Sequence, residues 1–172
     1  LDLFSGVGVF GLTVAHKIPN ISKVIGYEIV KEAVLDANEN AIMNNLSNTC
    51  EFYVRDLTKP GPLEGIDVDD TNNSNDEGDA DCIVEAVILD PARPGCSKDI
   101  LSEIRKLRPK RIVYVSCNPD TQARDASILF GNEDETGGPS SLPTYSLASV
   151  KPCDMFPHAL HVETVAVFDR VD

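Results

Sequence analysis

Short apolar runs alternate with segments of helical period along most of the chain. The apolar runs predict strands over residues 1–4, 23–27, 50–55, 86–89, 111–115, 145–151 and 162–169. Amphipathic segments predict helices over residues 9–17, 30–44, 98–107 and 119–130. The runs 86–89 and 111–115 lack polar alternation, which is typical of central strands covered on both faces. This order of elements predicts an α/β fold with a largely parallel, twisted sheet and helices on both faces.

Two segments have the composition of loops rather than of packed elements. Residues 64–81 hold eight acidic side chains and no Lys or Arg, which predicts an acidic insertion outside the core. Residues 131–143 are rich in Gly, Pro and Ser. The 172 residues suffice for one domain, so we expect 1–172 to form a single unit. Because the chain opens inside a strand-like run without Met, we expect an upstream part of the natural protein to be absent.

Composition and charge indicate which cellular compartment and which kinds of partner to expect. Five cysteines form no CxxC pair, and an odd number argues against a disulfide framework, so we expect a reducing intracellular compartment such as cytoplasm, nucleus or an organelle. No apolar run approaches the roughly 20 residues that span a bilayer, so we expect no membrane partner. The net charge of −13 does not resemble that of a phosphate-binding surface. Basic residues do crowd into 98–111, and we interpret them as a solvated helix face.

A glycine-rich turn follows the first predicted strand. Gly6, Gly8 and Gly11 form a GxGxxG pattern that opens a helix, and glycines let backbone N–H groups approach a ligand closely. Glu28 closes the second strand, where a carboxylate can accept hydrogen bonds from ribose hydroxyls. Together they predict a site for an adenosine-containing cofactor, although the pattern does not separate a dinucleotide from S-adenosylmethionine.

The next two central strands are also followed by residues that could take part in a reaction. Asp90-Pro91-Ala92-Arg93 follows the strand at 86–89 and brings a carboxylate and a guanidinium to the rim. Cys117 follows the strand at 111–115, with Asn118 as the expected N-cap of a helix and Pro119 at its first position. The partial positive charge of a helix N-terminus favours a thiolate, which makes Cys117 a candidate nucleophile.

A further cluster precedes the last strand. His158, His161 and Glu163 suggest a metal site, but their spacing is not the helical HExxH and no Cys pair supplies further ligands, so we expect no metal. Glu163 therefore remains available as a general base at the rim of the pocket.

Four motifs occur in a characteristic order. They are Leu3-Phe4-Ser5-Gly6-Val7-Gly8, Asp90-Pro91-Ala92-Arg93, Ser116-Cys117-Asn118-Pro119, and Met155-Phe156-Pro157-His158 followed by His161-Val162-Glu163. In these motifs the chain resembles the RNA m5U (uracil-C5) methyltransferases over essentially its whole length. The resemblance implies a Rossmann-like class I methyltransferase fold, S-adenosyl-L-methionine as cofactor, and tRNA or rRNA as substrate.

The resemblance also implies roles for individual residues. Cys117 matches the nucleophile of the family and Glu163 its proton acceptor. Phe4, Gly6, Gly8, Glu28 and Asp90 match cofactor contacts, and Asp90 and Arg93 are the expected contacts to the uracil. The chain departs from the family at Val9, at Ala159-Leu160, in the acidic insertion, and in lacking an upstream region with a cofactor-contacting Gln.

Three alternatives stay open on the sequence. An RNA m5C methyltransferase would use a second cysteine after the proline of the fourth-strand motif, where Ala92 stands and Cys96 lies further on. An NAD-dependent oxidoreductase fits the glycines and Glu28 but leaves Cys117 without a role. A non-catalytic RNA-binding subunit would need no nucleophile. The sequence does not specify the modified uridine or the oligomeric state.

Overall fold

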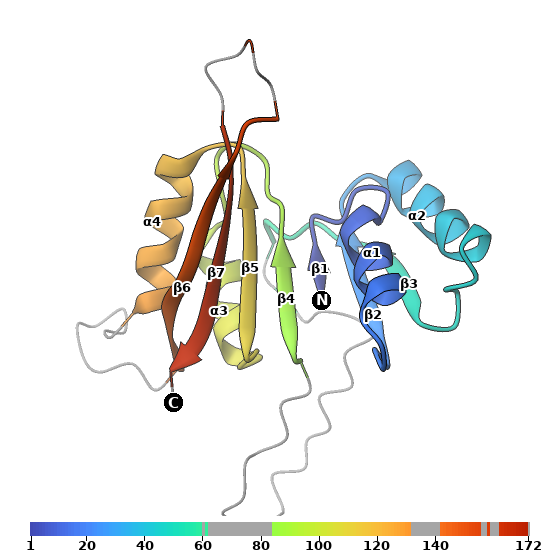
Figure 1. Ribbon diagram of the computed structural model, residues 1–172, viewed down its shortest axis with the longest axis horizontal. Coiled ribbons are helices and arrows are strands. Elements are labelled where there is room, and N and C mark those ends of the chain that lie inside the picture. The colour runs from blue at the N-terminus through green and yellow to red at the C-terminus, as the bar shows by residue number, and fades with distance from the viewer. Residues whose placement is uncertain (60, 62–83, 132–141, 156–157, 159–161, 172) are drawn as a thin grey trace, which may run out of the picture.

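The computed structural model describes residues 1–59, 61, 84–131, 142–155, 158 and 162–171. Its strands form one seven-stranded sheet in the order β3-β2-β1-β4-β5-β7-β6 (Figure 1). The strands are β1 (Asp2–Leu3), β2 (Val24–Glu28), β3 (Cys50–Val54), β4 (Ala86–Leu89), β5 (Arg111–Ser116), β6 (Thr144–Cys153) and β7 (Glu163–Val171). The first five are parallel, and β7 runs antiparallel to both β5 and β6. The expected α/β fold with a largely parallel sheet is confirmed.

Helices cover both faces of this sheet. They are α1 (Val9–Lys17), α2 (Lys31–Met43), α3 (Lys98–Lys106) and α4 (Pro119–Phe130). Successive side chains of a strand point to opposite faces, and β2 accordingly divides its residues between two apolar cores. Ile25 and Tyr27 join a core with residues of α3 and α4, whereas Val24 joins a second core with residues of α1 and α2. Burial on both faces explains why the central strands have continuous apolar sequences.

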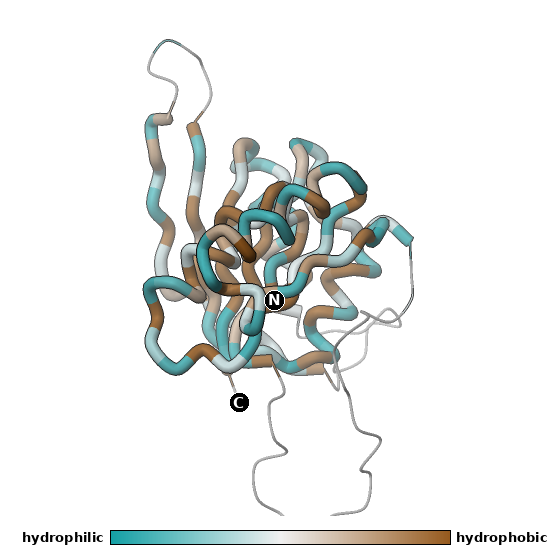
Figure 2. Tube along the Cα trace, turned by 90° about the vertical axis from the view of Figure 1, so that its right-hand side faces the viewer, coloured by the Kyte–Doolittle hydropathy of each residue, from teal (hydrophilic) through white to brown (hydrophobic). Residues whose placement is uncertain are grey.

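The predicted elements agree with the observed ones to within two residues at each end. Phe4 differs in a way that bears on function: the sequence places it in the first strand, but the strand ends at Leu3 and Phe4 has a φ of 64°. The chain leaves the sheet there because it must turn into the glycine-rich loop. In the hairpin of β6 and β7, the residues of β7 alternate between buried and half-buried over most of the strand, whereas most of β6, at the edge of the sheet, is exposed. Figure 2 shows brown and teal segments along this hairpin.

The parallel arrangement gathers the loops of interest at one edge. β4 and β5 both end at the upper edge in Figure 1, and the loops that follow them therefore emerge side by side there. The acidic segment 64–81, together with 132–141 of the second predicted loop, lies outside the described residues. Among the described residues, no helix is long and apolar enough to cross a membrane.

Candidate active site at the carboxyl edge of the sheet

The glycine-rich loop lies between β1 and α1 and has a left-handed backbone. Gly6 has φ 52° and Gly8 has φ 83°, a region that L side chains rarely adopt. A Cβ at Gly8 would lie 2.8 Å from the Phe52 ring, so this position must be small. A Cβ at Gly6 would meet nothing within 4 Å. The backbone at Gly6 therefore faces open space, as a loop that receives a ligand requires.

Glu28 joins this loop to the end of β2. Its Oε2 accepts a hydrogen bond from the Gly6 N–H at 3.0 Å, and its Oε1 accepts from the N–H groups of Ile29 and Val30 at 2.8 and 3.0 Å. A carboxylate has about four acceptor positions, so it keeps capacity for one further donor. The side chains of Ile29 and Val30 are 57 % and 49 % exposed. They place apolar surface beside a hydrogen-bonding carboxylate, which suits a planar base joined to a ribose.

Sequence reasoning did not identify Ile29 and Val30 as part of this rim. The available signal was two apolar residues directly after the strand-ending acid, at the point where a solvent-exposed connection is expected to be polar.

The Cys117 loop is held in place by local hydrogen bonds. The Ser116 hydroxyl donates to the Asn118 carbonyl and accepts from the Asn118 N–H, both at 3.0 Å. The Asn118 side chain caps α4 by accepting from the Asp120 N–H at 3.2 Å, and Pro119 occupies the first turn. The expected cap is confirmed, and half-buried Cys117 lies directly before the helix N-terminus.

The register of β5 and β7 brings Cys117 and Glu163 to the same place. Ser116 pairs with Thr164, so the two candidate residues are the next ones beyond this pair, on facing strands. A buried network fixes this register, because the Thr164 hydroxyl lies 2.8 Å from Gln122 Oε1 and 3.2 Å from the Ser116 carbonyl oxygen. Only the fold brings the two residues together, since 46 positions separate Cys117 from Glu163 in the chain.

Glu163 also has a neighbour on its other side. In the pairing of β6 with β7, Cys153 is its direct partner, and its side chain is half-buried like that of Cys117. The sequence did not single out Cys153, because the register between the two consecutive strands that carry Cys153 and Glu163 cannot be read from the sequence.

Asp90 lies next to these residues at the end of β4. Neighbouring atoms desolvate its carboxyl although the residue keeps solvent-exposed surface, and this desolvation raises its pKa, with the negative charge of Glu163 adding to the effect. Because the charge of Glu163 affects the pKa of Asp90, the two carboxyl groups lie close enough to interact electrostatically. Arg93 is exposed, and its carbonyl accepts hydrogen bonds from the side chains of Asn118 and Thr121.

Cys96 has a very different environment from Cys117. It is 5 % exposed, and burial raises the pKa of its thiol to about 12. A thiol with this pKa carries almost no thiolate near neutral pH, so Cys96 is unsuited to nucleophilic attack.

The histidine-containing motif is only partly described. Met155 and His158 are exposed, whereas His161 lies outside the described residues. In the part of the chain that the structure describes, no group of three or more His, Cys, Asp or Glu side chains is arranged to hold a metal ion.

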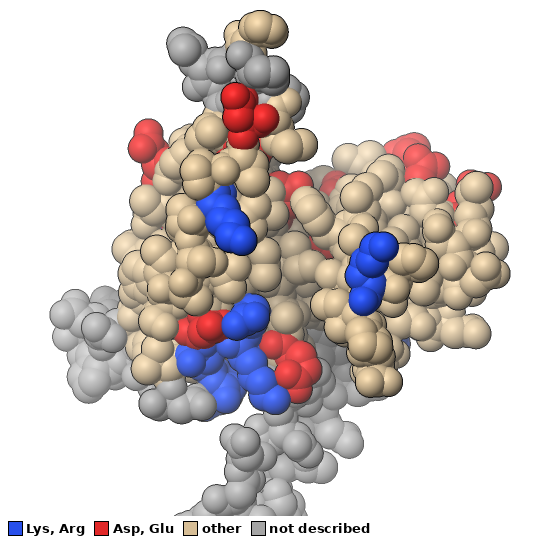
Figure 3. Space-filling model, in the orientation of Figure 1, with Lys and Arg blue, Asp and Glu red and all other residues tan. Residues whose placement is uncertain are grey.

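The basic residues near α3 do not form a free cationic face. Arg105 is buried and donates to the carbonyls of Gly131, Leu142 and Pro143, so the interpretation of the whole stretch as a solvated helix face is wrong for this residue. Arg111 forms an ion pair with Asp169. Figure 3 shows the basic group, with acidic side chains among it, at the lower end of the molecule. Arg111 begins β5, so it lies at the opposite end of that strand from Cys117.

Comparisons with known proteins show the family of the chain. The model of the tRNA (uracil-5-)-methyltransferase family matches residues 1–165. An RNA methyltransferase of Bacillus cereus is 38 % identical over 175 residues, covering 100 % of this chain and 31 % of its own length. One from Caldanaerobacter subterraneus is 38 % identical over 173 residues, covering 99 % and 32 %. The chain thus spans about a third of the length of these relatives.

Solved structures give the same result. The tRNA (uracil-54, C5)-methyltransferase of Pyrococcus abyssi, in complex with S-adenosyl-L-homocysteine, superposes with a TM-score of 0.70 and 30 % identity, covering 97 % of this chain and 33 % of that protein. TrmN from Thermus thermophilus shares the fold, with a TM-score of 0.57 and 14 % identity over 99 % of this chain and 43 % of its own. The family match over 165 residues and the shared sheet show that this chain belongs to the tRNA (uracil-5-)-methyltransferase family.

Proposed function

We propose that this chain is the catalytic part of an S-adenosyl-L-methionine-dependent enzyme that forms 5-methyluridine in tRNA or rRNA. The observation that carries the proposal is the convergence at one sheet edge of a thiol, Cys117, and a carboxylate, Glu163, with Asp90 in electrostatic range. The reaction needs a nucleophile and a base on the same substrate ring, and this pair supplies one of each.

The residues around the glycine-rich loop suit the cofactor. Gly6 leaves its backbone open to a ligand, Glu28 retains an acceptor position for a ribose hydroxyl, and Ile29 and Val30 offer apolar surface to an adenine. Phe4 and Gly8 shape the loop, and Asp90 borders it, because the Asp90 N–H donates to the carbonyl of Leu3 at 3.3 Å. When bound there, S-adenosyl-L-methionine would supply an electrophilic methyl group on a sulfonium.

The protein residues account for the remaining chemistry. C5 of uracil is a weak nucleophile, so the Cys117 thiolate first adds to C6, and the displaced electron pair makes C5 nucleophilic. C5 would then take the methyl group as the methyl–sulfur bond of the sulfonium breaks and leaves its electron pair on the sulfur, after which C5 carries both methyl and hydrogen. Glu163 removes that proton, the electron pair restores the C5–C6 double bond, and the Cys117–C6 bond breaks to release the thiolate.

Asp90 and Arg93 are the candidates for holding the uracil edge. Negative charge develops at O4 while the adduct exists, and Arg93 is a nearby cation that can offset it. The Asp90 carboxylate can accept a hydrogen bond from the imide N–H of the base. A stacked, paired uridine cannot present C6 to a thiolate, so the target must be flipped out or lie in a loop.

The burial of Cys96 bears on the competing RNA m5C activity. That activity needs a second reactive cysteine near the fourth-strand motif, and Cys96, with a pKa of about 12, does not meet the requirement. An NAD-dependent oxidoreductase would have no use for the pairing of Cys117 with Glu163, and neither would a non-catalytic RNA-binding subunit.

RNA carrying 5-fluorouridine at the target position tests the proposal. Fluorine replaces the proton that Glu163 would remove, so methyl transfer proceeds, elimination stops and the adduct survives a denaturing gel. Cys117→Ala should abolish both trapping and turnover. Glu163→Gln should instead accumulate adduct with ordinary uridine RNA, because addition and methyl transfer remain possible while the base is missing.

The matched control is Cys153→Ala. Cys153 is the direct partner of Glu163 in the pairing of β6 with β7 and is half-buried like Cys117, so its loss tests whether another thiol beside Glu163 can act as the nucleophile. We expect this variant to trap and turn over RNA like the wild type. If Cys117→Ala still gave a methylated, denaturation-resistant complex and Cys153→Ala did not, the assigned nucleophile would be wrong.

A further inference from the structure

Asp125 is a fully buried carboxylate that the proposed reaction does not use. It lies on α4, the helix that begins just after Cys117, and it is 0 % exposed. Its Oδ2 accepts hydrogen bonds from the Tyr114 hydroxyl at 2.6 Å and from the Cys96 N–H at 2.7 Å. Its Oδ1 accepts from the Nε and Nη2 of Arg124 at 2.8 and 2.6 Å. These four bonds use the roughly four acceptor positions of a carboxylate, so none remains for a substrate.

The two partners of Asp125 Oδ2 belong to two different catalytic segments. Cys96 closes the loop that carries Asp90 and Arg93, whereas Tyr114 lies on β5, two residues before the strand ends at Ser116. A buried carboxylate would be costly without partners, and the two bonds to its Oδ2 exist only while both segments are in place.

Further bonds from α4 hold the same loop. Arg124 Nη2 donates to the carbonyls of Pro94 and Cys96 at 2.8 and 3.2 Å. The Thr121 hydroxyl donates to the Arg93 carbonyl at 3.1 Å, and the Asn118 amide does so at 3.3 Å. The loop backbone from 93 to 96 is therefore held by side chains of the helix that follows the nucleophile.

The loop also closes tightly onto this network. Gly95 has φ 78°, and a Cβ there would lie 2.5 Å from Asp125 Oδ2 and 2.8 Å from Arg124 Nη2. Only glycine allows the loop to approach the carboxylate this closely.

We propose that Asp125, with Tyr114 and Arg124, is a positioning centre that holds the Asp90–Arg93 loop in register with Cys117 for attack on the uracil. This inference rests on the proposed function. It predicts that a variant with fewer bonds to Asp125 forms the adduct more slowly, while its affinity for the cofactor and the reactivity of the Cys117 thiol change less. A misplacement of about 1 Å in a catalytic group can cost about 100-fold in rate. The glycine-rich loop between β1 and α1, by contrast, has no bond to Asp125 among the described residues.

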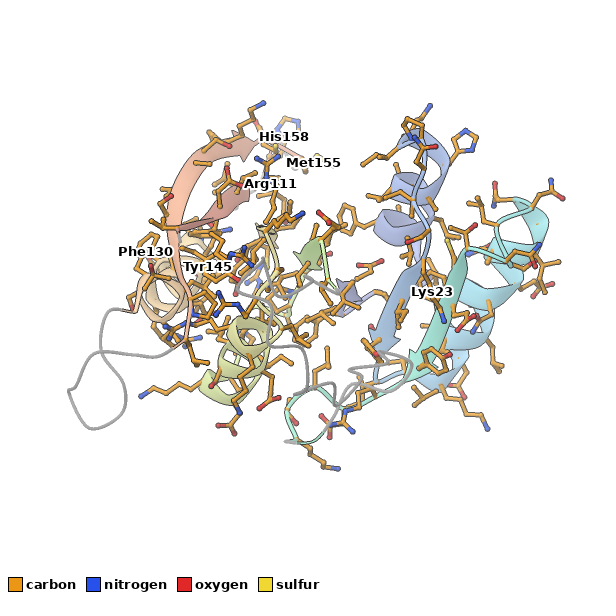
Figure 4. The ribbon with its side chains drawn as sticks, turned by 90° about the horizontal axis from the view of Figure 1, so that it is seen from below. Lys23, Arg111, Phe130, Tyr145, Met155 and His158 are labelled. Carbon is orange, nitrogen blue, oxygen red and sulfur yellow. The ribbon has the colours of Figure 1, made fainter. Side chains whose placement is uncertain are left out.

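The test compares two buried tyrosines. Tyr114→Phe removes the hydroxyl bonded to Asp125, and Tyr145→Phe removes an equally buried hydroxyl that donates to the Pro109 carbonyl at 2.9 Å. Viewed from below, Tyr145 lies at the same side of the molecule as Phe130, far from Lys23 at the opposite side (Figure 4). Pro109 precedes β5, so the control bond lies at the opposite end of that strand from Cys117.

The full-length protein is assayed with 5-fluorouridine RNA under single-turnover conditions. We expect Tyr114→Phe and Asp125→Asn to slow adduct formation by about 10- to 100-fold. Binding of S-adenosylhomocysteine should weaken by less than adduct formation slows, because Asp90 is the one proposed cofactor contact on this loop. The rate of Cys117 alkylation by iodoacetamide should stay at the wild-type value. Tyr145→Phe should form adduct at the wild-type rate, even if its melting temperature falls as much as that of Tyr114→Phe.

The outcomes separate this inference from the proposed function. A wild-type protein that forms no adduct refutes the proposed function. A wild type that forms adduct, with Tyr114→Phe no slower than Tyr145→Phe, refutes the positioning role and leaves the function standing. If Asp125→Asn does not fold, Tyr114→Phe still decides, because it leaves three of the four bonds to the carboxylate intact.

Discussion

Glu28 offers the sharpest test of the cofactor site, because the structure limits what its carboxylate can do. Three backbone N–H groups occupy three of its roughly four acceptor positions, which leaves one for a ribose hydroxyl. A hydrogen bond to a charged group contributes about 1.5–3 kcal/mol. Glu28→Ala should therefore weaken binding of S-adenosylhomocysteine by roughly 10- to 150-fold.

The same substitution also removes the acceptor of the Gly6 N–H, so loop disorder could mimic a lost ribose contact. Calorimetry with S-adenosylhomocysteine and its 2′-deoxy and 3′-deoxy analogues separates the two effects. The wild type should lose affinity for the analogue that lacks the contacted hydroxyl, whereas Glu28→Ala should bind that analogue and the parent compound equally.

Glu32→Ala is the matched control, since Glu32 is an exposed carboxylate in the first turn of the next helix. It should bind all three ligands like the wild type. The assignment of Glu28 to the ribose fails if Glu28→Ala discriminates among the three ligands as strongly as the wild type does, whatever its absolute affinity.

Two further predictions follow from buried groups. Burial raises the pKa of Asp2 from 3.8 to about 6, so folding favours the protonated form of its carboxyl. The protonated carboxyl therefore adds to the free energy of unfolding. This contribution is complete below about pH 4 and is lost as the pH rises through about 6. Urea titrations should show that Asp2→Asn removes up to about 3 kcal/mol of this pH dependence, and identical slopes for variant and wild type would contradict the burial argument. In the native protein at neutral pH, mass spectrometry after iodoacetamide should find Cys117 alkylated at least about tenfold faster than Cys96. Equal rates would remove the reason for excluding Cys96 as a nucleophile.

Local sequence determined most of the elements of this protein. Continuous apolar runs specify central strands because both faces of a parallel sheet are buried, and this pattern needs no knowledge of the partners. Asn118 and Pro119 specify the start of α4 through a side-chain cap and a fixed φ, which are also local effects. The positive φ values at Gly6 and Gly8 agree with the glycines that the loop carries.

The tertiary structure decided which of the candidate groups meet. Strand pairing brings Cys117 opposite Glu163, and it brings Cys153 to the other side of Glu163. Sequence spacing alone gives neither relation, because the register of paired strands depends on the packing of the sheet, whether they are distant, as β5 and β7 are, or consecutive, as β6 and β7 are. The strand that the sequence extends through Phe4 ends one residue earlier for a similar reason, since the turn into the cofactor loop overrides local β propensity.

Burial made the same kind of distinction among residues of one type. Cys96 and Cys117 each lie in the loop after a central strand, but the core encloses one thiol and leaves the other partly exposed. Asp125 and Asp120 occupy the same helix, yet only Asp125 is buried and accepts hydrogen bonds from a loop residue, Cys96, and a strand residue, Tyr114. Composition and helical period mark both aspartates as polar, whereas the desolvation of a charge and its compensation depend on every neighbour that folding brings to it.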